Sequence, residues 1–131
     1  MKIKKFTFNS FQENTYVISS QKKCMIIDPG CQNDTEKEIL ENYIAENELK
    51  PTILINTHCH LDHIFGNKFV ADTYQLSPIM HRSDLPMLEY APLAASQYGL
   101  LLEELPEVTN FVEEGDILKF GTSEFEIIFT P

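Results

Sequence analysis

The stretch Thr57-His58-Cys59-His60-Leu61-Asp62-His63 directly follows residues 52–56 (TILIN), a short, apolar and β-branched run. Such a run is typical of a buried strand. Three of the four histidines in the chain fall within residues 58–63, together with one aspartate. Imidazole and carboxylate groups form common ligand sets for Zn²⁺, and also for iron and manganese. We therefore predict a metal site at the carboxyl end of this strand.

The spacing within the cluster allows two sets of ligands. Positions two apart in extended backbone point to the same side, so His58, His60 and Asp62 share one side. His63 points elsewhere, from the start of the helix that follows. Two neighbouring metals that share a water would lower its pKa and make hydroxide available at neutral pH. Asp62 is the candidate catalytic residue, because it can ligate a metal and also orient the attacking water or accept its proton.

The remaining pattern predicts a layered α/β domain with a mixed sheet. An antiparallel meander closed by Asp28-Pro29-Gly30 opens the chain, with strands expected at residues 2–8, 15–19 and 24–27. Asn33 or Asp34 can cap a helix that Pro51 ends. Later elements are a helix from about 63 to 74, a strand at 78–81, mostly helix over 84–102, and strands at 115–121 and 125–129.

Length and composition bound the class of protein. A chain of 131 residues suits one globular domain, and its hydrophobic content of 43% argues against disorder. With a net charge of −10, the chain repels phosphate backbones, so no nucleic-acid partner is expected. Residues 1–6 are basic without a following apolar run, so we expect no signal peptide and no membrane segment.

The three cysteines, Cys24, Cys31 and Cys59, are odd in number and show no Cys-x-x-Cys spacing. A disulfide framework is therefore not expected, and a reducing compartment, the cytoplasm, fits better. Alternation along the chain turns Cys59 away from the side that carries His58 and His60. We expect Cys59 to pack in the core rather than to bind metal.

The motif His58-x-His60-x-Asp62-His63 after a buried strand resembles the signature of the metallo-β-lactamase superfamily. Upstream, residues 14–17 (NTYV) and 26–30 (IIDPG) resemble segments of glyoxalase II-like hydrolases, the relatives of hydroxyacylglutathione hydrolase. The resemblance implies the N-terminal half of an αββα sandwich, with a mixed sheet and flanking helices. It also implies an α/β (α+β layered) fold.

The resemblance further implies a ligand set and a reaction. It assigns His58 and His60 to a first metal and Asp62 and His63 to a second, with zinc expected and iron or manganese as alternatives. Asp28 is implied to be a hydrogen-bonding residue beneath the site rather than a ligand. The implied reaction is cleavage of a small-molecule thioester or ester by metal-bound hydroxide, as in a glyoxalase II-like dizinc hydrolase.

The next motif of that family, Gly-His-Thr, would begin after Thr130-Pro131. We therefore expect one domain over residues 1–131 that stops before its remaining ligands, binds metal weakly or not at all, and is inactive alone. We also expect an uncovered sheet face that drives homo-oligomer formation. Two alternatives stay open: an iron-dependent member similar to persulfide dioxygenases, and a non-catalytic truncated domain that binds or assembles.

Overall fold

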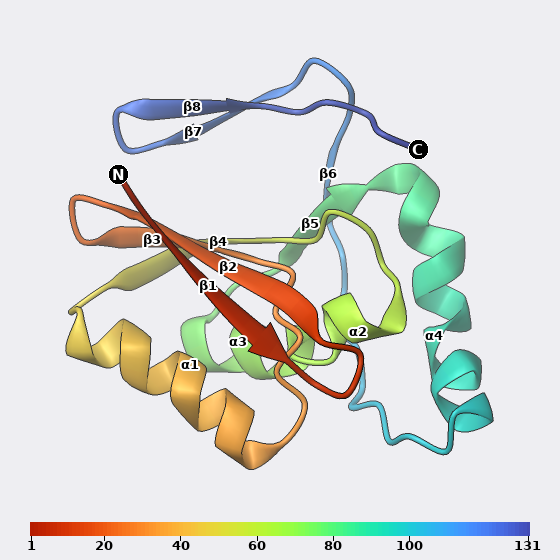
Figure 1. Cartoon of the computed structure of the whole chain (residues 1–131). Helices are drawn as coiled ribbons and strands as arrows, with labels where there is room; N and C mark the ends of the chain where they lie inside the picture. Colours follow the sequence, from red (N-terminus) through yellow and green to blue (C-terminus); the bar gives the residue numbers. More distant parts are fainter.

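A computed structural model describes residues 1–131, and a six-stranded mixed sheet forms its centre (Figure 1). The first three strands pair antiparallel and the following pairs are parallel, which confirms the opening meander and the mixed sheet. The strands lie side by side in chain order: β1 (Lys2–Phe8), β2 (Glu13–Ser20), β3 (Lys23–Ile27), β4 (Lys50–Ile55), β5 (Pro78–His81) and β6 (Asn110–Val112).

Helices and a separate hairpin complete the layers. The hairpin consists of β7 (Ile117–Phe120) and β8 (Ser123–Glu126), which pair only with each other. The helices are α1 (Asp34–Glu46), α2 (Leu61–Ile64), α3 (Asn67–Tyr74) and α4 (Leu85–Gln97), with the 3-10 turn η1 (Arg82–Asp84) before α4. Figure 1 shows α1 and α3 on one face of the sheet and the hairpin on the opposite face. None of these helices has the length and apolar character needed to cross a membrane.

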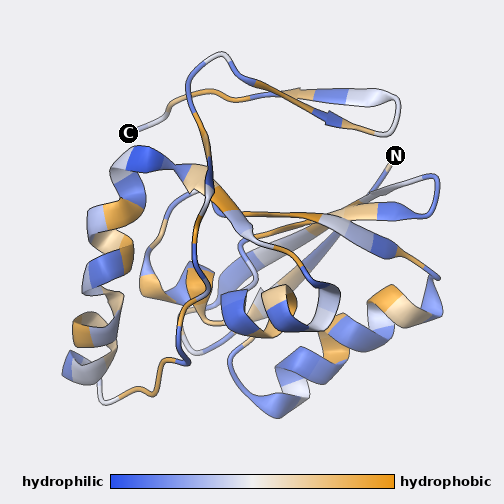
Figure 2. Ribbon diagram, turned by 180° about the vertical axis from the view of Figure 1, so that it is seen from behind, coloured by the Kyte–Doolittle hydropathy of each residue, from blue (hydrophilic) through white to orange (hydrophobic).

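Alternation along the central strands builds one apolar cluster on each face of the sheet. Ile26 of β3 packs in the cluster that includes Leu40 of α1 and Val70 of α3. Its neighbour Met25 points to the opposite face and joins a cluster that includes Phe120 of the hairpin. Figure 2 shows the apolar residues concentrated along the central strands and hydrophilic residues along much of α1. Successive residues of β3 point to opposite faces of the sheet, and both faces are apolar. This explains why the sequence of β3 is a continuous apolar run.

The predicted helix from about residue 63 to 74 is confirmed over Asn67–Tyr74, but its predicted start is wrong, because the chain breaks between α2 and α3. The backbone N–H of Gly66 donates to the carbonyl of Pro29 at 2.7 Å. A side chain at Gly66 would meet Cys31 Sγ at 2.5 Å and the Pro29 carbonyl at 2.7 Å. Close packing against the Asp-Pro-Gly turn thus redirects the chain after α2. The helix that follows Asn33 is confirmed, since the Asn33 side chain accepts from the Glu36 N–H at 2.8 Å.

The structure also corrects the prediction that one face of the sheet is uncovered. The hairpin packs part of that face, with Phe120 only 2% exposed among Ile18, Met25 and Ile55. Strand β6 was not predicted, because it has only three residues and its parallel pairing with β5 comes from residues far along the chain. Homo-oligomer formation through the sheet face stays a prediction.

Candidate metal centre

The histidine cluster leaves the carboxyl end of β4, and Asp28 leaves the carboxyl end of β3. These two strands are parallel neighbours, so their carboxyl ends meet at the same edge of the sheet. The backbone N–H of Asp28 donates to the carbonyl of Ile55 at 3.0 Å and continues the pairing beyond β3. The topology therefore brings Asp28 next to the residues that follow β4.

Asp28 is a buried carboxylate that fixes the start of the cluster. It is 3% exposed, and its backbone adopts the left-handed conformation with φ of 51°. Its Oδ1 accepts from the Thr57 N–H at 2.7 Å, and its Oδ2 accepts from the Thr57 hydroxyl at 2.5 Å. Both bonds agree with the hydrogen-bonding role implied for Asp28, and they hold Thr57 where β4 ends.

Thr57 in turn determines which nitrogen of His58 carries the proton. The Thr57 Oγ1 lies 3.0 Å from His58 Nδ1. A hydroxyl has one hydrogen, and that hydrogen is donated to Asp28, so Thr57 accepts a hydrogen bond from Nδ1–H of His58. The lone pair of His58 then lies on Nε2. Burial, and next the neighbouring His63, lower the pKa of His58, which favours the neutral ring that a metal requires.

His63 lies among three acidic side chains. Its Nδ1 lies 3.0 Å from Asp28 Oδ2 and 3.7 Å from Glu13 Oε1, while its Nε2 lies 3.5 Å from Asp62 Oδ2. The Asp28 contact is close without the alignment of a hydrogen bond. Burial alone would lower the pKa of His63, but Asp28, and then Asp62 and Glu13, outweigh it and raise the pKa. The carboxylates therefore orient this ring by charge.

The structure brings together part of the predicted ligand set. Ligand atoms of Asp28, His58 and His63 lie within 4.8 Å of one another, and that group does not include His60 or Asp62. The exposed His60 ring packs edge-on to His58, with 4.7 Å between the ring centres. Two imidazoles and a carboxylate are a donor set that fits zinc, iron or manganese. The ligand roles of His60 and Asp62 stay predictions.

Glu13 is a site residue that the sequence reasoning missed. It is 3% exposed, its Oε2 lies 2.8 Å from the Thr15 hydroxyl, and its Oε1 has no hydrogen-bond partner. Burial is the main cause that raises the pKa of Glu13 to about 8. Strand alternation could have identified Glu13 from the sequence, since Glu13 and Thr15 share one face of β2 with the buried Val17. A carboxylate on the apolar face of a strand is rarely buried without a partner.

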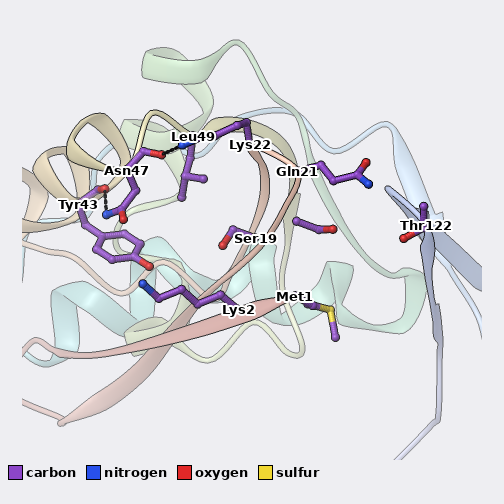
Figure 3. Close-up of a pocket in the computed structure, with 10 residues that line it drawn as sticks. Met1, Lys2, Ser19, Gln21, Lys22, Tyr43, Asn47, Leu49 and Thr122 are labelled. Atoms are coloured by element: carbon purple, nitrogen blue, oxygen red, sulfur yellow. Dashed lines mark hydrogen bonds between the residues drawn. The ribbon is translucent and has the colours of Figure 1, made fainter.

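Two cavities lie at opposite ends of the central strands. His58 and His60 line a cavity of about 780 Å³ between the sheet and the hairpin, together with Met25, Ile55 and Phe125. A second cavity of about 570 Å³ lies near the amino ends of β3 and β4 and contains no candidate ligand (Figure 3). Its residues are tied to the end of α1, for example by the Asn47 amide donating to the Tyr43 carbonyl at 2.8 Å.

Cys59 packs in the core, as predicted. It is 1% exposed and lies in an apolar cluster with Ile64, Met80 and Leu88. Burial raises the pKa of Cys59 to about 12, so its thiol stays protonated and is a poor metal ligand. Cys24 and Cys31 are also buried, and none of the three cysteines forms a disulfide.

Comparison with known proteins agrees with the geometry. The model of the metallo-beta-lactamase superfamily matches residues 9–131. The probable metallo-hydrolase YqgX of Bacillus subtilis (strain 168) is 30% identical over 132 residues, which are 100% of this chain and 61% of YqgX. The hydroxyacylglutathione hydrolase GloC of Haemophilus influenzae is 30% identical over 139 residues, with coverage of 100% and 61%. The chain spans about three fifths of the length of these relatives.

Solved structures agree with the fold. The crystal structure of BLEG-1 B3 metallo-beta-lactamase matches with a TM-score of 0.84 and 26% identity, over 99% of this chain and 62% of that one. TTHA1623 in a di-iron-bound form matches with a TM-score of 0.76 and 31% identity, over 87% of this chain and 56% of that one. The family match over residues 9–131 and the position of the histidine cluster lead to one assignment. The chain belongs to the metallo-beta-lactamase superfamily.

Proposed function

We propose that the chain carries the first ligands of a two-metal hydrolase centre of the glyoxalase II-like type. His58 and His60 would hold the first metal, and Asp62 and His63 the second. Family membership supports metal-dependent hydrolysis, and the likeness to a hydroxyacylglutathione hydrolase supports a small-molecule thioester, with esters as the alternative class. Residues 1–131 would form part of a single domain, and three unpaired cysteines agree with a reducing cytoplasm.

The observation that carries this proposal is the shared support of His58 and His63 by Asp28. Asp28 holds Thr57, which accepts from His58, and the same carboxylate contacts Nδ1 of His63. His58 is therefore oriented through Nδ1, which leaves its Nε2 for a ligand, and the charge of Asp28 draws Nδ1 of His63 toward the same carboxylate. Carboxylate or hydroxyl partners of this kind normally orient metal-binding histidines. Both Asp28 oxygens accept from Thr57, which supports the hydrogen-bonding role proposed for Asp28, and their remaining lone pairs still face the ligand atoms of His58 and His63.

When bound, the metal pair would supply an activated water and stabilise negative charge that develops on the substrate carbonyl oxygen. The chain would supply the remaining functions. Asp62, whose side chain is 24% exposed, stands beside Nε2 of His63, where it can orient a water or accept a proton. The cavity beside His58 and His60 would admit an acyl group, since Met25 and Ile55 give part of its wall an apolar character.

Metal analysis and a thioesterase assay test the proposal. The product of the complete reading frame that encodes residues 1–131 should contain two metals per chain and release thiol from an S-hydroxyacylglutathione. The isolated chain should bind metal weakly and show no turnover. Replacement of His58 or His63 by alanine should abolish metal content and hydrolysis together, whereas Lys119→Gln on the exposed hairpin should change neither. Hydrolysis that survives His58→Ala would contradict the proposal.

The identity of the metal separates the alternatives. Two zinc ions with thioester hydrolysis agree with the glyoxalase II-like centre, and the di-iron-bound relative keeps iron as a second choice of metal for the same reaction. One iron per chain, with oxygen consumed in the presence of a persulfide, would instead support the dioxygenase alternative. A complete gene product without metal or turnover would favour the non-catalytic alternative.

A further inference from the structure

The turn that joins β1 to β2 reaches the backbone of the histidine cluster through Asn9. Asn9 has a φ of 55°, in the left-handed region that asparagine tolerates better than most residues with a side chain. Its Oδ1 accepts from the N–H of Phe11 at 2.9 Å, and its carbonyl accepts from the N–H of Gln12 at 3.2 Å. The turn therefore closes on Asn9 itself.

The same bonds fix the orientation of the Asn9 amide. Because Phe11 occupies Oδ1, the Nδ2 group must face the other way, toward two backbone carbonyls. Nδ2 lies 3.0 Å from the carbonyl of Gly30 and 3.0 Å from the carbonyl of Asp62. An amide NH₂ has two hydrogens, so one is available for each carbonyl. Asn9 thus links the Asp-Pro-Gly turn to the backbone of Asp62.

Neighbouring contacts leave little freedom around this link. The N–H of Asn9 donates to Glu36 Oε2 at 2.6 Å, and the other oxygen of Glu36 accepts from the N–H of Gln32 at 2.9 Å. Gly30 has no room for a side chain, since a Cβ there would lie 2.6 Å from the Asp62 carbonyl. The first turn of α1 therefore anchors Asn9, and Asn9 holds Asp62 against Gly30.

We propose that Asn9 is a positioning residue for the Asp62–His63 pair. By holding the Asp62 carbonyl, it sets where the Asp62 carboxylate and the His63 ring lie relative to His58. The inference rests on the proposed metal centre, in which Asp62 and His63 hold the second metal. Asn9 acts through the backbone and does not contact that metal. Loss of a group that hydrogen-bonds to a metal ligand directly weakens metal binding about 10- to 100-fold, and we expect the lower end of that range for Asn9, which acts through the backbone.

Three variants test the role of Asn9. Asn9→Gly keeps access to positive φ and removes both bonds, and Asn9→Asp keeps the shape but turns an oxygen toward two carbonyls. The matched control is Asn47→Asp, which removes a bond from an asparagine amide to the Tyr43 carbonyl at the far end of α1. Titration of the complete gene product with Co²⁺ should show about 10-fold weakening for both Asn9 variants. The control should bind Co²⁺ like the wild type.

A measurement without metal keeps the two proposals separate. Amide hydrogen exchange of the metal-free chain should become faster at His63 and Gly66 in Asn9→Gly, with amides of β4 unchanged. If the wild type binds no Co²⁺ but exchange at His63 and Gly66 is still faster in Asn9→Gly, the proposed metal centre would be wrong and the positioning role would be supported. Unchanged exchange with unchanged Co²⁺ affinity would overturn the role of Asn9. Equal acceleration at every amide would also overturn it, because Asn9 would then contribute only general stability.

Discussion

Two regions adjoin the central sheet: the site at the carboxyl edge of β3 and β4, and the β7–β8 hairpin. Different interactions hold these two regions in place. At the edge, Asp28, Thr57 and Asn9 make directional hydrogen bonds with partners from several segments. The hairpin forms no ladder with the central sheet, and Phe120 and Phe125 hold it by apolar packing. Directional bonds specify the positions of atoms, whereas apolar packing tolerates changes of shape that keep volume. Metal chemistry needs the first kind of support.

The largest difference between the carboxyl edge and the hairpin should be in how each contributes to the pH dependence of stability. Of these two regions, only the carboxyl edge contains a buried carboxyl group with a strongly raised pKa. The pKa of Glu13 is raised from 4.5 to about 8 in the folded chain. Between those values the folded state binds more protons than the unfolded state, so stability falls as pH rises. The raised pKa of His63 has the same sign, since its contribution is complete below the unfolded pKa and is lost as pH rises through the folded one.

Urea unfolding of the metal-free chain at pH 5 and pH 8 checks this prediction. The wild type should lose on the order of a few kcal/mol, since one unit of pKa corresponds to about 1.4 kcal/mol. Glu13→Gln stays neutral across the range, so most of the loss should disappear in this variant. Equal pH dependence in the two proteins would show that Glu13 does not titrate as its burial requires.

A substitution in the hairpin should lower stability and leave the metal centre intact. Phe120→Ala removes a ring that is 2% exposed in the cluster beneath the hairpin. We expect a loss of about 3 kcal/mol in the free energy of unfolding, at the lower end for a buried phenylalanine, because the hairpin has core on one side only. Co²⁺ affinity, measured under conditions where the variant is folded, should match the wild type. A weaker affinity would mean that the hairpin also positions the ligands.

A substitution at the carboxyl edge should alter the metal centre, and it should lower stability less than the hairpin substitution does. Asp28→Asn keeps one acceptor for Thr57 but places an NH₂ group beside the Thr57 hydroxyl or the His63 ring. We expect a loss of about 2 kcal/mol, as for a disturbed buried hydrogen bond to a charged group. The ring nitrogens of His58 and His63 should show altered proton positions by ¹⁵N NMR. Unchanged ring signals would contradict the role given to Asp28.

Local pattern predicted most of the elements that surround the site. Strand β5 (Pro78–His81) was predicted at its observed bounds, and the Asn33 cap and the strand before His58 were also predicted correctly. The break between α2 and α3 was not, because it depends on the contact of Gly66 with Pro29 and Cys31. Strand β6 was missed for a related reason, since three residues carry too little periodicity to signal a strand.

The amino-acid sequence alone determined the family, the histidine cluster and its place after a buried strand, because ligand spacing and apolar runs are local properties. The tertiary structure decided which groups support that cluster. Asp28 and Asn9 reach it from 29 and 53 residues away, and Glu13 reaches it from β2, through contacts that no short-range pattern encodes. Chemistry at the edge depends on these contacts, since burial sets the pKa of Glu13 and hydrogen bonds set the orientation of His58.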